Sequence, residues 1–357
     1  MSMLPRIATI SALLAPSIAA AADAQAKISG GEEVGPEEHP SAGFIMFIFD
    51  DLDYEEPRVF SGCSASLIAP DVVLTAAHCL HNQEIYEDAP DWYSYWRLFF
   101  TTSADMSGYD FDTHVALPED AVRSSGRVMH PDYDFENECD GDGESDSLRQ
   151  CNDLGLLFLE EPSPGPFGWL PSEDEAAGIV EGAPVVVVGY GLSHSDNPDS
   201  GGIRRQASTV IVEVGGHELR IGEPDPAAHK CLGDSGGPTF MDVETALAHS
   251  ERIIGVTSGA YTREDGTNRT CTSGGRDTRV DTYLDWIDSE MRKACDDGLR
   301  TACEEPGILR PPEDFDTGEF FEEPEAKACG CSSRGTGSTP AAVLVLLLGS
   351  VLLRRTV

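Results

Sequence analysis

The sequence predicts an all-β protein, and three observations carry this prediction. Short apolar runs recur along the chain, clusters of Gly, Pro, Asp and Ser separate them, and one stretch alone has convincing helical spacing. The 357 residues include 36 Gly and 23 Pro, and 40% are hydrophobic, so a sizeable core can form. This pattern favours a sandwich or barrel of short strands over βαβ repeats.

The predicted strands lie between Ile28 and about Met291. Their apolar and β-branched residues suit a pleated, buried surface, and turn residues bound each run. The runs are GFIMFIF (43–49), ASLIAP (65–70), DVVLTAA (71–77), LGLLFLEEP (154–162), APVVVVGYG (183–191), STVIVEV (208–214) and RIIGVTSGA (252–260).

The predicted helix is VDTYLDWIDSEMRKAC (280–295), near the end of this region. Leu284, Ile287 and Met291 recur at spacings of three and four, and Tyr283 precedes them. Such spacing places apolar side chains on one helix face.

The first 24 residues have the pattern of a secretory signal peptide. Arg6 precedes the apolar run IATISALLAPSIAA (7–20), and small residues at 22–24 suit a signal peptidase. The run is short for a membrane helix. Export to an oxidising compartment makes the ten cysteines candidate disulfide partners.

The charge excludes one class of partner. The formal net charge of −39 argues against nucleic-acid binding and predicts a soluble, self-repelling surface. The segment 140–146 (DGDGESD) alternates oxygen donors with flexible residues, which is a weak calcium-loop pattern without the distal Glu of an EF-hand. We therefore expect a solvated acidic loop, no metal site and no cofactor.

The composition changes after Met291. Residues 292–328 are acidic and Pro-rich and predict a stalk with a small loop between Cys295 and Cys303. Residues 329–357 contain Cys-Gly-Cys, a small-residue spacer, an apolar stretch within 340–353 and two arginines.

The stretch HKCLGDSGGPTF (229–240) crowds three glycines around Ser235. A nucleophilic serine needs a base, an acid that orients the base, and donors for the oxyanion. His78 ends one apolar run in VVLTAAHCL, and Asp153 begins another in CNDLGLLFL. A buried carboxylate at such a place needs a partner such as an imidazole N–H.

Four motifs in order make the chain resemble the trypsin/chymotrypsin family of secreted serine endopeptidases. They are ISGG (28–31), TAAHC (75–79), NDL (152–154) and GDSGGP (233–238). The resemblance covers about 28–291 and implies two antiparallel six-stranded β-barrels with a short C-terminal helix. It leaves 25–27 as a short propeptide and implies protein or peptide substrates.

The resemblance also implies roles at the site. Ser235 is the nucleophile, His78 its base, Asp153 the orienting acid, and the N–H groups of Gly233 and Ser235 the oxyanion hole. Cleavage after Lys27 by an activating protease frees the Ile28 amine, which then pairs with Asp234. The alternative interpretation is a non-catalytic surface-binding protein that keeps the protease fold.

Disulfides follow from the same resemblance and from proximity, since spacing alone does not fix connectivity. The expected pairs are Cys63–Cys79, Cys139–Cys151, Cys231–Cys271 and Cys295–Cys303.

The specificity pocket departs from the family pattern, because His229 stands where trypsin-like members carry an acid. Two alternatives stay open. His229 and Lys230 favour an acidic or polar residue before the cut, or Asp277 restores a basic preference. Three further residues are expected to line this pocket, which are Ser258, Gly259 and Gly275; the two glycines would leave it open.

The carboxyl end resembles the myxobacterial C-terminal sorting tail (MYXO-CTERM). By this resemblance, 340–353 holds the exported chain transiently at the membrane until a processing enzyme cuts near the cysteines. A permanent anchor is the alternative, and the expected location is the cell surface, outer membrane or extracellular space.

Overall fold

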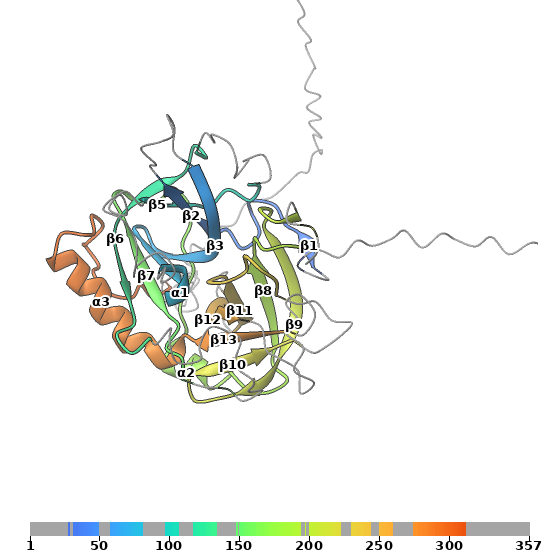
Figure 1. Ribbon diagram of the computed structural model, residues 1–357. Helices are drawn as coiled ribbons and strands as arrows, with labels where there is room; N and C mark the ends of the chain where they lie inside the picture. The colour runs from blue at the N-terminus through green and yellow to red at the C-terminus, as the bar shows by residue number, and fades with distance from the viewer. Residues whose placement is uncertain are drawn as a thin grey trace, which may run out of the picture. The chain divides into compact units, whose positions relative to one another are not determined.

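Two closed six-stranded antiparallel β-barrels form the body of the protein in a computed structural model of the chain (Figure 1), which confirms the predicted fold class. The structure describes residues 28, 31–49, 58–80, 97–106, 117–133, 148, 150–193, 197, 200–222, 230–243, 250–259 and 274–311. The segment expected to be a signal peptide (1–24), Lys27, the acidic segment 140–146, His229 and the C-terminal segment 329–357 lie outside these residues.

The first barrel closes in the order β2-β3-β4-β7-β6-β5. Its strands are β2 (Ala42–Phe49), β3 (Arg58–Ala69), β4 (Val72–Thr75), β5 (Arg97–Thr101), β6 (Val122–Met129) and β7 (Gly155–Leu159), with helix α1 (Ala77–Leu80) directly after β4.

The second barrel closes because β8 pairs with both β9 and β11. Its strands are β8 (Pro184–Gly189), β9 (Arg205–Val214), β10 (Glu218–Ile221), β11 (Pro238–Asp242), β12 (Glu251–Gly259) and β13 (Gly275–Arg279), and β1 (Glu32–Glu33) joins β9 at the edge. Other elements within the described residues are α2 (Glu173–Ala176), the 3₁₀ helix Asp281–Tyr283 and α3 (Leu284–Asp296).

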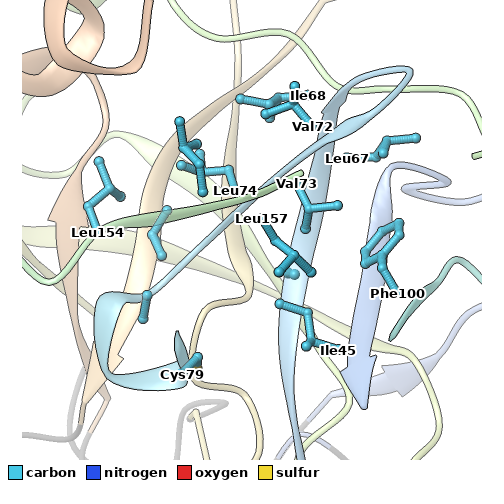
Figure 2. Packing of buried hydrophobic residues seen from close by; sticks show 14 of the residues in the cluster. Ile45, Leu67, Ile68, Val72, Val73, Leu74, Cys79, Phe100, Leu154 and Leu157 are labelled. Atoms are coloured by element: carbon cyan, nitrogen blue, oxygen red, sulfur yellow. The ribbon is translucent and has the colours of Figure 1, made fainter. Parts of the chain in front are cut away.

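The core of the first barrel is built from the apolar runs that the sequence displays. Ile45, Leu67, Val73, Phe100 and Leu157 are fully buried in one cluster, and Figure 2 shows their side chains meeting between the strands. Successive side chains of a strand point to opposite faces. Phe44, Met46 and Ile48 of β2 accordingly enter a separate buried cluster, which explains why this strand is apolar throughout.

Helix α3 packs on this core through the face that its spacing predicts. Ile287 and Met291 are 0% exposed and belong to the same cluster as Leu154 and Leu157. Burial of each such side chain stabilises the fold by about 1.5–3 kcal/mol. The described residues contain no helix that is long and apolar enough to cross a membrane.

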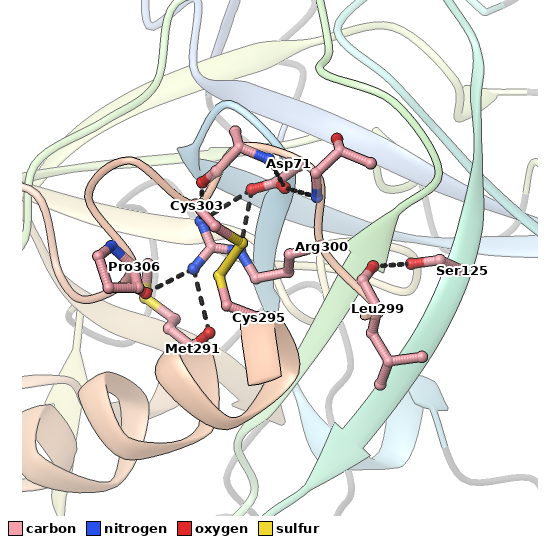
Figure 3. A network of polar contacts seen from close by, with 10 residues as sticks. Asp71, Ser125, Met291, Cys295, Leu299, Arg300, Cys303 and Pro306 are labelled. Carbon is pink, nitrogen blue, oxygen red and sulfur yellow. Dashed lines mark hydrogen bonds and ion pairs between the residues drawn. A yellow bond between two sulfur atoms is a disulfide. The ribbon is translucent and has the colours of Figure 1, made fainter. Parts of the chain in front are cut away.

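The expected start of the stalk at residue 292 is too early. The Arg300 guanidinium donates to Asp71 Oδ1 through Nε at 3.0 Å and Nη2 at 2.8 Å, and neither side chain is exposed (Figure 3). The N–H groups of Thr301 and Ala302 donate to the other oxygen of Asp71. Residues 292–311 thus belong to the folded body, because the buried guanidinium of Arg300 forms its ion pair with Asp71 of the first barrel.

Candidate active site

The barrel register brings His78 and Asp153 together. Strand β4 pairs antiparallel with β7, and Thr75 at the end of β4 lies opposite Gly155 at the start of β7. His78 lies in α1, three residues after Thr75, and Asp153 lies two residues before Gly155. Two positions that are 75 residues apart therefore meet at one end of the first barrel.

The Asp153 carboxylate accepts three hydrogen bonds, and two of them come from His78. Asp153 Oδ1 accepts the backbone N–H of His78 at 2.9 Å, and Asp153 Oδ2 lies 2.8 Å from His78 Nδ1. Oδ2 also accepts the Ser258 hydroxyl from β12 at 2.7 Å. Because the Asp153 side chain is 1% exposed and the His78 side chain 27% exposed, the imidazole joins a buried acid to solvent.

The charges of this pair support each other. Burial opposes the imidazolium, but the charge and hydrogen bond of Asp153 outweigh it and raise the pKa of His78 above 6.5. Burial likewise opposes the Asp153 carboxylate, but His78 and Ser258 together lower its pKa below 3.8. Asp153 therefore stays ionised and holds Nδ1 as the protonated nitrogen, which leaves Nε2 as the basic one.

Backbone contacts from both barrels fix Asp153. The Thr278 hydroxyl of β13 donates to the Asp153 carbonyl at 3.0 Å. Asn152 adopts φ 51°, and its side chain accepts the Tyr283 hydroxyl at 2.8 Å and donates to the Asp132 carbonyl at 3.0 Å. Sequence reasoning missed the supporting residues Thr278 and Tyr283, because nothing in their local sequence marks them.

The Ser235 turn lies against the strand that leads to His78. Gly236 has φ 78°, and a Cβ there would lie 2.1 Å from Thr75 Oγ1 and 3.2 Å from the Ala76 nitrogen. Only glycine can adopt this backbone without strain and admit so close an approach. The chain just after Ser235 therefore touches the chain just before His78.

The imidazole and the Ser235 hydroxyl are not hydrogen-bonded to each other within the described part of the chain. His78 Nε2 instead lies 3.7 Å from Cys79 Sγ. Ligand atoms of His78, Cys63 and Cys79 lie within 4.8 Å of one another, but the two sulfurs are joined in a disulfide and are not thiolate ligands.

The peptide planes around Ser235 have fixed orientations. The Leu232 carbonyl accepts the N–H of Leu192 at 2.8 Å, and the Asp234 carbonyl accepts the N–H of Gly237 at 2.9 Å. In a trans peptide the N–H points opposite to the carbonyl. The N–H of Gly233 shares a peptide plane with the Leu232 carbonyl, and the N–H of Ser235 shares one with the Asp234 carbonyl. Each N–H therefore points away from the hydrogen bond that its carbonyl accepts.

Ser64 of β3 attaches this turn to the first barrel. Its hydroxyl donates to the Gly233 carbonyl at 2.8 Å and accepts the N–H of Tyr190 at 2.9 Å. Sequence reasoning did not include Ser64, although its place directly after Cys63 beside the histidine motif could have drawn attention to it.

Asp234 is a buried carboxylate held by backbone donors. The N–H groups of Gly191 and Cys231 donate to its two oxygens at 2.8 and 2.7 Å. Burial nevertheless raises the pKa of Asp234 to about 6, against the effect of these donors and of the charges on Lys230 and Arg205. The two backbone contacts fix the carboxylate between the segments that carry Gly191 and Cys231.

Ile28 lies in the core of the second barrel. Its side chain is 1% exposed and belongs to the same buried cluster as Val185 and Val187 of β8. Asp234 also lies against β8, because a Cβ on Gly189 would fall 2.2 Å from Asp234 Oδ1. The φ of Ile28 is 42°, a left-handed value that β-branched residues rarely adopt.

Both alternatives for the specificity pocket required Lys230 or Asp277 to face the substrate, and in the structure these two side chains contact each other instead. The two side chains form an ion pair with 6% and 0% exposure. Gly275 does not leave an opening, because a Cβ there would lie 2.7 Å from Lys230 Cδ. Lys230 is therefore not available to an acidic substrate residue, and Asp277 is not available to a basic one. Gly259 lies at the end of β12. Among the described residues, a Cβ at this position would meet only the guanidinium of Arg276 within 4 Å, at 3.8 Å.

Two of the expected disulfides lie within the described residues. The structure contains Cys63–Cys79 and Cys295–Cys303, and the first bond joins β3 to α1 beside His78. Cys151 and Cys231 are also disulfide-bonded, while their expected partners Cys139 and Cys271 lie outside the described residues.

The chain belongs to the trypsin family of serine-type endopeptidases. The family model described as Trypsin matches residues 28–287, which include both barrels and all the site residues above. Similar proteins include the CLIP domain-containing serine protease B15 of Anopheles gambiae, 28% identical over 74% of this chain and 70% of that protein. The vitellin-degrading protease of Bombyx mori is 24% identical, over 74% of this chain and 86% of its own length. Mast cell protease 3 of Ovis aries is 25% identical, over 79% and 96%.

Proposed function

We propose that this enzyme hydrolyses peptide bonds through a Ser235–His78–Asp153 triad and an acyl-enzyme. The observation that carries the proposal is the pairing of His78 Nδ1 with the buried Asp153, which leaves Nε2 as a base beside the Ser235 turn. Hydrogen bonds between catalytic groups are often long before substrate binds. The Nε2–hydroxyl contact forms in the substrate complex.

The steps follow from these positions. Ser235 Oγ attacks the scissile carbonyl while its proton passes to His78 Nε2, and the carbonyl oxygen becomes an oxyanion. The N–H groups of Gly233 and Ser235 donate to this oxyanion. His78 then gives the proton to the leaving amine, the amide C–N bond breaks, and an acyl ester remains on Ser235. Water, deprotonated by His78, hydrolyses the ester and restores the enzyme.

A fluorophosphonate probe tests the nucleophile. We expect the wild-type protein to be labelled covalently and Ser235→Ala to remain unlabelled. Ser250→Ala removes an exposed hydroxyl that contacts Asp242 and serves as the matched control, which should label as the wild type does. An unlabelled wild-type protein that still bound surfaces would favour the non-catalytic alternative.

Cleavage after Lys27 is the proposed activation step. A new amine at Ile28 would add an opposite charge near Asp234, whose burial raises its pKa to about 6 and so disfavours the unpaired carboxylate. Cleavage would also end the constraint on φ at Ile28, because this dihedral includes the Lys27 carbonyl carbon. The variant Lys27→Gln, which blocks this cleavage, should react slowly with the fluorophosphonate probe. Protein that starts at Ile28 should react fast.

Export and surface sorting complete the proposal. Residues 1–24 direct secretion, and the apolar stretch within 340–353 holds the chain transiently at a membrane until a processing enzyme removes the tail. Mass spectrometry of the mature protein should find Ile28 as the first residue and no peptide that ends at Val357. Recovery of the intact tail would indicate a permanent anchor.

A further inference from the structure

The buried Lys230 ammonium has no hydrogen left for a ligand. Nζ donates to Thr239 Oγ1 at 2.9 Å, to Thr257 Oγ1 at 2.7 Å, and to Asp277 Oδ1. An ammonium carries three N–H donors, and these three contacts use all of them. The side chain that the sequence places next to the catalytic loop is therefore internally satisfied.

Both oxygens of the Asp277 carboxylate also have hydrogen-bond partners within the protein. Oδ1 accepts from Lys230, and Oδ2 accepts the Thr239 hydroxyl at 2.5 Å. The carboxylate packs against β12, where a Cβ on Gly255 would lie 2.7 Å from Oδ2. With 0% exposure, this acid cannot attract a charged group from solvent unless Lys230 leaves.

This ion pair lies directly behind the nucleophile turn. The Thr257 hydroxyl that accepts from Lys230 donates to the Gly237 carbonyl at 3.0 Å. The Thr257 carbonyl accepts the N–H of Gly236 at 2.8 Å, and the next residue, Ser258, donates to Asp153. One threonine thus joins the ion pair both to the Ser235 loop and to the strand that supports the triad.

The aliphatic stem of Lys230 fills the space that a glycine leaves open. A Cβ at Gly275 would lie 2.7 Å from Lys230 Cδ and 3.3 Å from its Cγ. The chain's own lysine thus lies in the wall where sequence reasoning expected an empty pocket. At the same time Leu232, directly before Gly233, is 59% exposed and presents an apolar surface.

This inference rests on the proposed function. We infer that Lys230 determines specificity: its side chain fills the space at Gly275, behind the Ser235 turn, that would otherwise receive the substrate residue before the cut. The enzyme therefore cleaves after small, uncharged residues. A basic side chain would meet an ammonium whose carboxylate is already taken, and an acidic one would find no unused donor. Either charge would be desolvated without a partner, which is strongly unfavourable. Removal of Lys230 would expose Asp277 to a substrate lysine, which carries the same ammonium on the same stem.

Cleavage of a peptide library that varies the residue before the cut tests this inference, with fluorophosphonate labelling of Ser235 as the parallel measurement. We expect wild-type enzyme to favour Ala, Ser and Val over Lys, Arg, Asp and Glu by about 100-fold. Lys230→Ala should gain at least about tenfold in relative cleavage after Lys. Lys230→Met keeps the volume and loses the charge, so it should not gain; Lys230→Ala with Asp277→Asn should lose the gain.

A binding measurement independent of activity covers a variant that folds poorly. Butylammonium should raise the melting temperature of Lys230→Ala, because it can pair with Asp277, and should not change that of the wild type or of Lys230→Met. Labelled wild-type enzyme that prefers a charged residue before the cut would overturn the inference. Labelled Lys230→Ala with neither new lysine cleavage nor butylammonium binding would overturn it as well. Absence of labelling in wild-type protein that starts at Ile28 would instead refute the triad.

Discussion

Ser258 and Asp153 come from different barrels, and the Ser258 hydroxyl donates to Asp153 Oδ2 across 2.7 Å. The same oxygen accepts a hydrogen bond from His78 Nδ1, so Asp153 is held by the second barrel and contacts an imidazole on the first. If Asp153 orients His78 as we propose, the contacts between the two barrels are part of the catalytic geometry, and small changes there should alter the kinetics.

The first prediction concerns Ser258 itself. Ser258→Ala removes one hydrogen bond to a buried carboxylate, and such bonds contribute about 1.5–3 kcal/mol. We expect kcat to fall by about tenfold to 100-fold with little change in KM, because the contact orients the base and does not bind substrate. Ser258→Thr keeps the hydroxyl and is the control. Equal rates for Ala and wild type would mean that Asp153 is oriented without Ser258.

The second prediction concerns the pH dependence set by Asp153. Since His78 must be neutral to accept a proton and its pKa is raised above 6.5, the acidic limb of kcat/KM should have its midpoint above 6.5. Asp153→Asn removes the charge that raises this pKa, so the midpoint should move down while kcat falls by about 10⁴-fold. A pH–rate profile of both proteins measures this, and an unmoved midpoint would contradict the assigned electrostatics.

The third prediction concerns Asp234 in the uncut chain. Because burial raises its pKa from 3.8 to about 6, the folded chain binds more protons than the unfolded chain between these pH values. The free energy of unfolding should therefore fall as pH rises through this window, by about 3 kcal/mol in total. Denaturation by urea at pH 4 to 7, in a Ser235→Ala background that prevents self-cleavage, measures the slope.

Two comparisons isolate the contribution of Asp234. Asp234→Asn should remove that part of the slope, and protein that begins with a free Ile28 amine should lose it also, since the amine supplies the missing opposite charge. An identical slope in the uncut wild type and in uncut Asp234→Asn would show that the carboxyl group is not the source.

The fourth prediction concerns Arg300, whose guanidinium also donates to the carbonyls of Met291, Ala302 and Pro306 (Figure 3). Arg300→Met leaves Asp71 buried with a lone charge and should reduce the free energy of unfolding by about 3–5 kcal/mol. The double variant with Asp71→Asn should recover part of this loss. Lys293→Met removes an exposed ion pair and should leave the free energy of unfolding nearly unchanged, which makes it the matched control.

The strands that sequence reasoning located share a property that β13 lacks. Apolar runs such as 183–191 and 252–260 became β8 and β12, since burying their side chains needs no particular partner. Strand β13 has the sequence GRDTR, yet four of its five residues are buried. Its side chains are buried only because Lys230, Glu218 and the Asp153 carbonyl lie opposite them, which no local pattern reveals.

The site divides along the same line. Motif order alone is the reason to propose His78, Asp153 and Ser235 as the catalytic residues, and the structure brings His78 and Asp153 within hydrogen-bond distance. The supporting contacts from Thr278 and Tyr283 come from distant segments that no motif marks, and Ser64 had only its place next to Cys63 as a signal.

By itself, the sequence determined the β-rich class and predicted a helix over 280–295, of which Leu284–Asp296 forms α3; it also led us to propose the three residues for acyl transfer. Only the tertiary structure decided that Lys230 and Asp277 cancel each other and that Arg300 joins the C-terminal segment to Asp71. The physical reason is that apolar burial depends on composition and spacing, whereas a buried charge is tolerated only where folding brings its partner within hydrogen-bond distance.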